Sequence, residues 1–256
     1  MDDVSRDAVT RVIRAMSENL GERITIDDMA RTAMFSKFHF SRIFLRVTGI
    51  SPGRFLSALR LQEAKRLLLT TSTTVADISH TVGYNSIGTF SSRFRSSVGV
   101  SPTEYRQLGG FPPPLPEVAT PGPGRGHIHG RVWTPPSCRP QRIVIGVFAD
   151  RVAQGCPVRH VTVDGAGAFT IDGVPDGTWH VLAHTADLTD PIPLSYVAAL
   201  GPLDIRHDVP VRTTDLWLRP RSLFDPPVLL AQLDEPMWVR GTWAPGRTED
   251  AVLPGA

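Results

Sequence analysis

The chain contains only two cysteines, Cys138 and Cys156, in 256 residues. Two cysteines make neither a disulfide framework nor a four-ligand zinc pattern. No apolar run reaches the ~20 residues that span a bilayer. The Met-Asp-Asp start also lacks the basic residues and the apolar stretch of a signal peptide. We therefore expect a cytoplasmic protein that has no membrane partner.

Catalytic patterns are missing as well. No Ser-His-Asp arrangement, carboxylate pair or phosphate-binding loop stands out, so we expect no enzymatic activity and no cofactor. Six of the eight histidines follow residue 110, and two pairs, His127 with His129 and His180 with His184, share strand faces. With the two cysteines they leave a metal or redox sensor open. Their spacing is generic, however, and exposed or core histidines are the simpler interpretation.

The net charge is small, but it is unevenly distributed. Residues 1–110 carry 15 Lys and Arg against 10 Asp and Glu, a net charge of +5. Residues 111–256 carry 12 against 15, a net charge of −3. A basic first half is what a nucleic-acid partner requires.

The same first half contains an internal repeat, in which residues 25–55 recur at 74–105. Two copies are too few for a solenoid. The spacing is 49 residues at the start of each copy and becomes 50 after one insertion. The matched pairs are Thr25 with Thr74, Asp28 with Asp77, Met29 with Ile78, Phe40 with Phe90, Phe44 with Phe94, Gly49 with Gly99, Ser51-Pro52 with Ser101-Pro102, and Phe55 with Tyr105.

Each copy predicts a short capped helix, a tight turn and a second capped helix, which together form a helix-turn-helix. In the first copy, Thr25 and Asp28 form a capping box, and Ser36 caps a helix that ends at Gly49. Ser51-Pro52 begins a long helix that joins the copies and ends near Thr70. An apolar stripe from Val9 to Leu20 predicts a further helix before the first copy.

The second half changes to alternating polarity. Candidate strands are 127–133, 142–149, 160–163, 168–171, 179–185 and 215–218, with a weaker one near 196–200. We therefore predict an all-α double helix-turn-helix domain over residues 1–108 and, over residues 126–220, an all-β antiparallel sandwich with Trp133, Trp179 and Trp217 in its core. Residues 109–125 read as a Pro/Gly-rich linker and residues 221–256 as a Pro-rich tail. Such a linker permits independent movement, and a negative sandwich should add little DNA affinity.

The repeat half resembles the DNA-binding domain of the AraC/XylS family of transcription regulators over residues 4–108. The most specific match runs from Val75 through Val82-Gly83-Tyr84, Phe90 and Phe94 to Gly99-Val-Ser-Pro102 and Tyr105-Arg106. Here Met34 replaces the usual glycine of the first turn, and the domain comes first in the chain. Residues 167–183 are similar to a carboxypeptidase-regulatory or transthyretin-like sandwich, which implies a fold and little about function.

The second helix of each unit should lie in the DNA major groove. The resemblance implies that Phe38, Ser41 and Arg42 face the bases, with Arg42 suited to guanine and Phe38 to a thymine methyl. Ser36 and Lys37 are placed for phosphate, and Arg46 lies on an outer face of the same helix. In the second copy the outward residues are small, which suits close approach and shape reading. They are Ile87, Thr89, Ser91 and Ser92, flanked by Arg93 and Arg95.

These patterns predict a sequence-specific transcription regulator whose partner is double-stranded DNA. The resemblance favours an activator that contacts RNA polymerase over a repressor. The sandwich is left to bind an effector, another protein or a second copy of itself. Two alternatives from other classes remain: a carbohydrate- or small-molecule-binding enzyme with an accessory helical half, and a structural adaptor whose DNA binding is weak.

Overall fold

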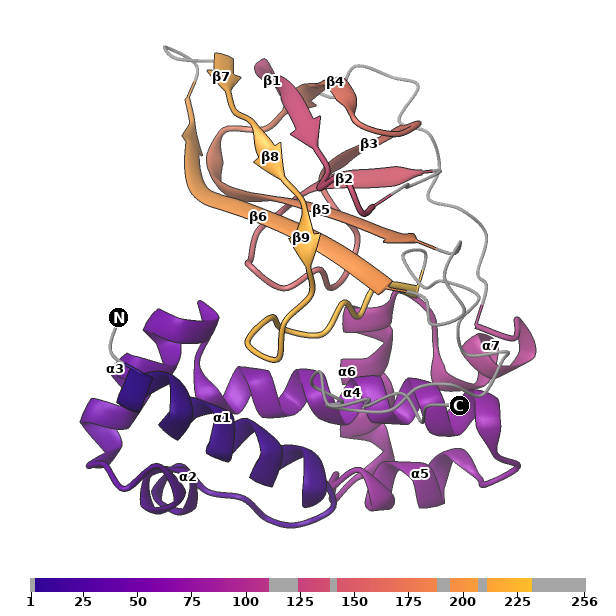
Figure 1. Ribbon diagram of the computed structural model, residues 1–256. Coiled ribbons are helices and arrows are strands. Elements are labelled where there is room, and N and C mark those ends of the chain that lie inside the picture. Colours follow the sequence, from indigo (N-terminus) through magenta and orange to yellow (C-terminus); the bar gives the residue numbers. More distant parts are fainter. Residues whose placement is uncertain (1–2, 111–123, 139–141, 188–193, 207–210, 232–256) are drawn as a thin grey trace, which may run out of the picture.

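The computed structural model of the protein describes residues 3–110, 124–138, 142–187, 194–206 and 211–231. Most of the predicted linker and residues 232–256 of the predicted tail lie outside these ranges. Helices fill the first part of the chain and strands the second, with the β-rich region above the helical region in Figure 1. The helices are α1 (Asp3–Glu18), α2 (Ile26–Ala33), α3 (Lys37–Thr48), α4 (Pro52–Thr70), α5 (Val75–Thr81), α6 (Ile87–Val98) and α7 (Pro102–Gln107).

The capping residues predicted from the sequence begin these helices. Thr25 forms a full capping box with Asp28, and the donated hydrogen bonds of Thr25 lower the pKa of that carboxyl group. Ser36 and Ser86 accept from backbone N–H groups in the first turns of α3 and α6. Gly49 and Gly99 end these two helices in the left-handed conformation. Local chemistry alone therefore sets the limits of the helix-turn-helix units.

The repeat continues into the core as two matching rows of aromatic rings. Phe44 lies edge-on to Phe40 and to Phe55, with ring centroids 5.5 Å apart in both pairs. In the second unit Phe94 lies 5.7 Å from both Phe90 and Tyr105. All six rings are buried, and edge-to-face packing of this kind adds to the free energy of area burial. The two units therefore have the same internal packing and attach to α4 between them.

The first turn differs from the second at one backbone position. Met34 ends α2 at a φ of 59°, and its repeat partner Gly83 has a φ of 83°. The turn hydrogen bonds correspond: Phe35 N donates to Ala30 O as Tyr84 N donates to Ser79 O. Met34 is also 78% exposed, so its side chain gains little from packing.

We expect Met34→Gly to stabilise the protein by ~0.5–1 kcal/mol in urea unfolding, because it removes the clash of a Cβ in the left-handed region. The greater freedom of glycine in the unfolded chain offsets part of that gain. Gly83→Ala is the opposite control, since a Cβ there meets the Leu20 carbonyl oxygen as well as an unfavourable φ. A less stable Met34→Gly variant would show that the methionine is not strained.

The strands form two sheets. β4 (Gly167–Val174), β1 (Gly126–Trp133) and β7 (Val211–Thr213) make one, with β8 (Leu216–Trp217) also paired to β1. The other has the order β3 (Arg159–Val163), β2 (Ile143–Phe148), β5 (Gly177–Asp187), β6 (Leu194–Ile205) and β9 (Arg219–Pro220). Side chains from both sheets, including Ile128, Phe169, Ile145 and Val181, share one buried cluster.

The prediction of a purely antiparallel arrangement is wrong for one edge. β7 and β8 both pair with β1 in parallel, while the other pairings are antiparallel. Of the stretch predicted as one strand over 215–218, only Leu216–Trp217 forms a strand, β8, and β9 follows directly at Arg219–Pro220 in the other sheet. Alternation of polar and apolar residues carries no information about strand direction, so the sequence could not show this crossing.

The prediction that three tryptophans fill the β core is also wrong in part. Trp179 packs against the core, and its indole N–H donates to Pro175 O at 2.8 Å. Trp217 is 68% exposed and stacks on the half-buried Trp133, with ring centroids 5.2 Å apart. Burial alternates along β8, so Leu216 is buried and the next residue, Trp217, faces solvent.

The two regions are packed together rather than joined only by a linker. Val152, Leu229 and Ala231 belong to the buried cluster of the helical region. The Arg6 guanidinium lies over the Phe224 ring, 4.8 Å from its centroid. Figure 1 shows the segment after β9 running down between the sheets and the helices. The expected independent movement of the β-rich region therefore does not fit the structure, because apolar side chains far along the chain fill helical-region core positions.

Candidate DNA-binding surface

The predicted contact residues of the first unit lie on the outer side of α3. Phe40, Ile43 and Phe44 are buried on its inner side. Phe38 is 81% exposed, which is unusual for an aromatic side chain without a partner to cover it. Arg42 is exposed on the same helix. A cation and an exposed ring on one helix surface can meet a guanine edge and a thymine methyl group.

The corresponding residues of the second unit lie on the outer side of α6. Phe90 and Phe94 point inward and are fully buried. Ile87 is 44% exposed, and Arg93 and Arg95 are exposed. The small hydroxyl side chains between them leave the helix backbone open to close approach.

The structure brings all twelve predicted residues to the surface on α3, α6 and their capping positions. Ser41 and Ser91 are half-buried and the other ten are exposed. The exposed ones are Ser36, Lys37, Phe38, Arg42, Arg46, Ile87, Thr89, Ser92, Arg93 and Arg95.

Two of these residues have partners within the protein: Ser36 makes the predicted cap, and Lys37 has an ion-pair partner that the sequence did not indicate. The Ser36 hydroxyl accepts from His39 N at 3.4 Å, so it caps α3 and keeps its own hydrogen for a phosphate. Lys37 Nζ lies 3.7 Å from Asp27 Oδ1 and 5.9 Å from the centre of the Phe38 ring. An exposed ion pair of this kind is weak and does not prevent Lys37 from meeting a phosphate.

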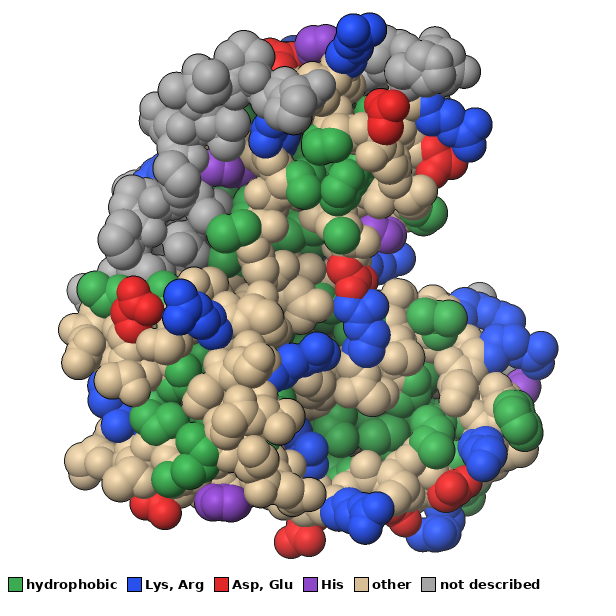
Figure 2. Space-filling view, turned by 180° about the vertical axis from the view of Figure 1, so that it is seen from behind, with side chains coloured by type: hydrophobic (Ala, Val, Ile, Leu, Met, Phe, Trp, Pro, Cys, Tyr) green, Lys and Arg blue, Asp and Glu red, His purple; other side chains and the backbone are tan. Residues whose placement is uncertain are grey.

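The structure adds Arg54, in the first turn of α4, to the basic residues near α6. Burial lowers the pKa of its guanidinium, and the positive charge of Arg93 lowers it further. Asp150 of the β-rich region forms an ion pair with it. Thirty-nine positions separate Arg54 from Arg93, so no local pattern could have paired them. Figure 2 shows Lys and Arg side chains on the helical region, which is the lower half of the picture, and at its junction with the β-rich region.

The histidine and cysteine hypotheses gain no geometric support from the described residues. His127 Nδ1 lies 2.7 Å from Asp172, and His129 Nε2 lies 2.8 Å from Thr213 Oγ1. Cys138 is buried, whereas Cys156 is exposed. Within the part of the chain that the structure describes, no three His, Cys, Asp or Glu residues gather as metal ligands would. Nor does any described helix combine the length and apolar content needed to cross a bilayer.

The fold and this surface define a class of protein: a double helix-turn-helix module with two exposed second helices. A family model described as a helix-turn-helix domain matches residues 29–108. The transcriptional activator AarP of Providencia stuartii is 31% identical over 98 residues, which cover 38% of this chain and 73% of that protein. The chain belongs to the AraC-type family of helix-turn-helix transcription regulators.

Other relatives match over a smaller part of their own length. The lactose operon transcription activator of Staphylococcus xylosus is 31% identical over 104 residues, 41% of this chain and 37% of that protein. The chain spans about a third of the length of most of the curated relatives it matches. A solved AraC-type regulator from Chromobacterium violaceum aligns with a TM-score of 0.41 and 28% identity, over 44% of this chain and all of that one.

Proposed function

We propose that the protein is a sequence-specific, double-stranded-DNA-binding transcription regulator that activates transcription by contacting RNA polymerase. The observation that carries the proposal is the pair of capped, outward-facing helices α3 and α6, held on one scaffold by α4. The basic charge of residues 1–110 favours the phosphate backbone. Activation is favoured because relatives such as AarP are named transcriptional activators.

We also propose that the β-rich region is a transthyretin-like sandwich with a regulatory or interaction role, and not a catalytic one. Its two sheets share one buried cluster, as the layers of a sandwich do. Its negative charge disfavours a share in the DNA grip. An effector, a protein partner or a second copy of the chain are its candidate ligands.

DNA binding is tested by selecting duplexes from a random pool with the full-length protein. The expected result is one enriched sequence with two short elements about one helical turn apart, ~34 Å, because one molecule carries two reading helices. The site need not be a palindrome. Enrichment of no sequence over the starting pool, by folded protein, would overturn the proposed function. Reporter transcription from a promoter carrying the selected site then separates activation from repression.

The roles of the two units are separated by a pair of arginine substitutions. Arg42→Ala is expected to cost ~1–3 kcal/mol of binding free energy and to relax base preference at one position, because a bidentate contact to guanine is lost. Arg95→Ala should weaken binding to all sequences and lower the salt slope by about 1, as loss of a phosphate contact does. Titrations of matched and single-mismatch duplexes at several salt concentrations measure both. The reverse pattern would assign base reading to the second unit.

A further inference from the structure

The loop that joins β2 to β3, residues 149–158, reaches the end of α6. Gly155 N–H donates to Ser97 O at 2.8 Å. The Ser97 hydroxyl lies 3.3 Å from Gln154 Oε1 and donates to it. Ser97 is 2% exposed and precedes the last residue of α6, so this contact holds the C-terminal end of the second reading helix. A loop of the β-rich region is therefore bonded directly to the second helix-turn-helix unit.

The same loop also reaches the end of α3 in the first unit. The Arg151 side chain packs so tightly against Gly49, the C-cap of α3, that a Cβ on this glycine would overlap it. Asp150 forms its ion pair with Arg54, three residues into α4 and just after that cap. Val152 lies in the loop between Asp150 and the residues that bond to Ser97, and it is 2% exposed inside the buried helical cluster. The loop therefore spans from the end of one reading helix to the end of the other.

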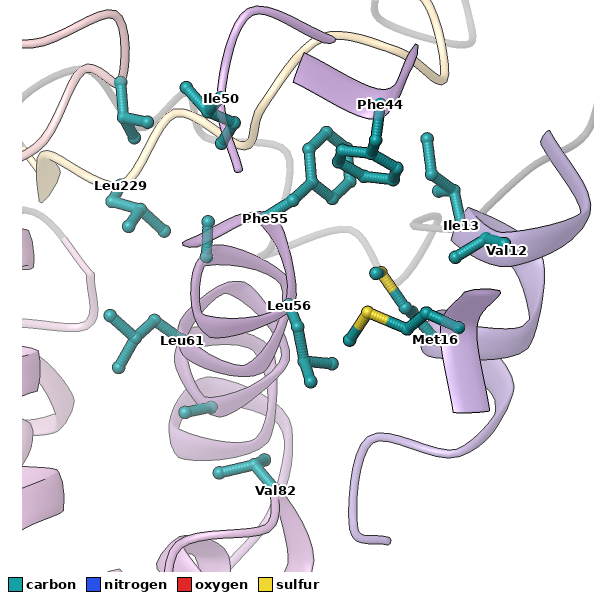
Figure 3. Packing of buried hydrophobic residues seen from close by; sticks show 14 of the residues in the cluster. Val12, Ile13, Met16, Phe44, Ile50, Phe55, Leu56, Leu61, Val82 and Leu229 are labelled. Carbon is teal, nitrogen blue, oxygen red and sulfur yellow. The ribbon is translucent and has the colours of Figure 1, made fainter. Parts of the chain in front are cut away.

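The segment 223–231 supports the loop from behind. Leu229 N and Leu230 N both donate to Ala153 O, at 2.9 and 3.1 Å. Lys65 of α4 donates from Nζ to Leu229 O at 3.1 Å. Figure 3 shows Leu229 beside Ile50 and Leu61 in the helical core. The loop is thus fixed to α4 through a second segment and is not a freely hanging connection.

Other contacts between the two units are limited. The main helix packing lies within each unit or against α4, whose 19 residues extend about 28 Å. The segment between α1 and α2 also approaches the second unit, since a Cβ on Gly21 would meet the Thr81 carbonyl oxygen and a Cβ on Gly83 would meet the Leu20 carbonyl oxygen. A rotation of the second unit about α4 would have to break the loop contacts at Ser97 or those at Gly49 and Arg54, because the loop is held at both ends.

We propose that residues 149–158 form a wedge that fixes the separation and orientation of α3 and α6, and so selects the spacing between the two DNA elements. This inference rests on the proposed DNA-binding function. Asp150, Val152 and Gly155 act as positioning residues and need not touch DNA. Rigidly linked sites bind together with a high effective concentration only when the target separation matches theirs. One added base pair shifts an element by ~3.4 Å and turns it by ~35°.

The test uses the full-length chain and the selected duplex, together with duplexes whose two elements are one base pair closer or farther apart. The native protein is expected to prefer the selected spacing by at least ~tenfold. In the double variant Asp150→Ala/Val152→Ser this ratio should fall to about twofold. Affinity for a duplex with only one intact element should stay within twofold of native, because each reading helix keeps its own packing. Removing the negative charge of Asp150 strengthens attraction to every duplex equally. The ratio of the affinities for the selected and the altered spacing is therefore unaffected by this gain.

The matched control is Asp164→Ala. It removes the same charge from an exposed position just past the far end of β3, away from the loop, and should keep the native spacing ratio. If the double variant does not fold by circular dichroism, Asp150→Ala alone is measured, and a fall of at least threefold in the ratio is expected. A folded variant with the native ratio would overturn the wedge while leaving DNA binding established. Failure of the native protein to select any site would instead overturn the proposed function itself.

Discussion

Leu229→Ala is expected to lower the free energy of unfolding by about 2–5 kcal/mol, because truncating a fully buried leucine leaves a cavity in the core. Leu229 has 0% exposure and lies in the cluster of the helical region, although it is 121 residues beyond the end of that region's sequence signature at residue 108. Its carbonyl oxygen also accepts from Lys65, a 1% exposed cation. The substitution therefore removes support from helices that precede it by more than 120 residues.

Urea unfolding followed by the helical circular dichroism signal measures this effect. The midpoint should fall for Leu229→Ala, whereas the half-buried neighbour Val228→Ala should change stability by about 1 kcal/mol or less. A helical midpoint that does not move would mean that the helical core is complete without this segment.

The packing of the β-rich region against the helices also affects how a truncated protein that lacks residues 125–256 would bind DNA. The composition of the sequence predicts that deletion of residues 125–256 leaves DNA affinity within about tenfold, ~1.4 kcal/mol. The structure shows that it would also remove Val152, Leu229 and Ala231 from the helical core. We therefore expect such a fragment to be less stable than the full chain, and its affinity has to be compared at a temperature where both are folded.

The second large effect is expected from pH acting through His184. This side chain is 8% exposed, and burial lowers the pKa of its imidazole to about 4, with the positive charges of Arg221 and Lys65 adding to the effect. An unperturbed histidine has a pKa of 6.5. The folded pKa is the lower one, so the unfolded chain binds the proton first as the pH falls. The stabilisation is complete above pH 6.5 and is lost between 6.5 and 4, on the order of 3 kcal/mol.

Urea unfolding at several pH values between 7.5 and 4.5 measures this contribution. The native protein should lose stability steeply across the window, and His184→Gln should flatten the slope because no proton uptake remains at this site. His80→Gln is the matched control for the substitution itself, since His80 is exposed on α5. Equal slopes for the native protein and His184→Gln would show that the pKa of His184 does not differ between the folded and unfolded states.

The sequence alone predicted the helical region closely because its limits are set by local chemistry. A capping hydroxyl, a proline at the first helical position and a left-handed glycine act within one turn of the residues they affect. The repeat spacing then placed Phe40 with Phe90 and Phe44 with Phe94 inside, which put Arg42 and Arg93 outside. The strands were also predicted from a local pattern, the alternation of polar and apolar residues. The strand with the weakest pattern, β6, is the longest described strand in the structure.

Only the tertiary structure decided how the two halves meet. The sequence could not show that β7 and β8 run parallel to β1, that Trp217 stays exposed, or that Asp150 pairs with Arg54. The composition of the sequence indicated a Pro/Gly-rich linker and a negatively charged β-rich region. Both features are compatible with a β-rich region that moves freely and with one that packs against the helices. The deciding contacts join residues more than 50 positions apart, such as Gly155 with Ser97 and Leu229 with Lys65. Pairings at that distance depend on where the chain returns in space, which local propensity and periodicity do not specify.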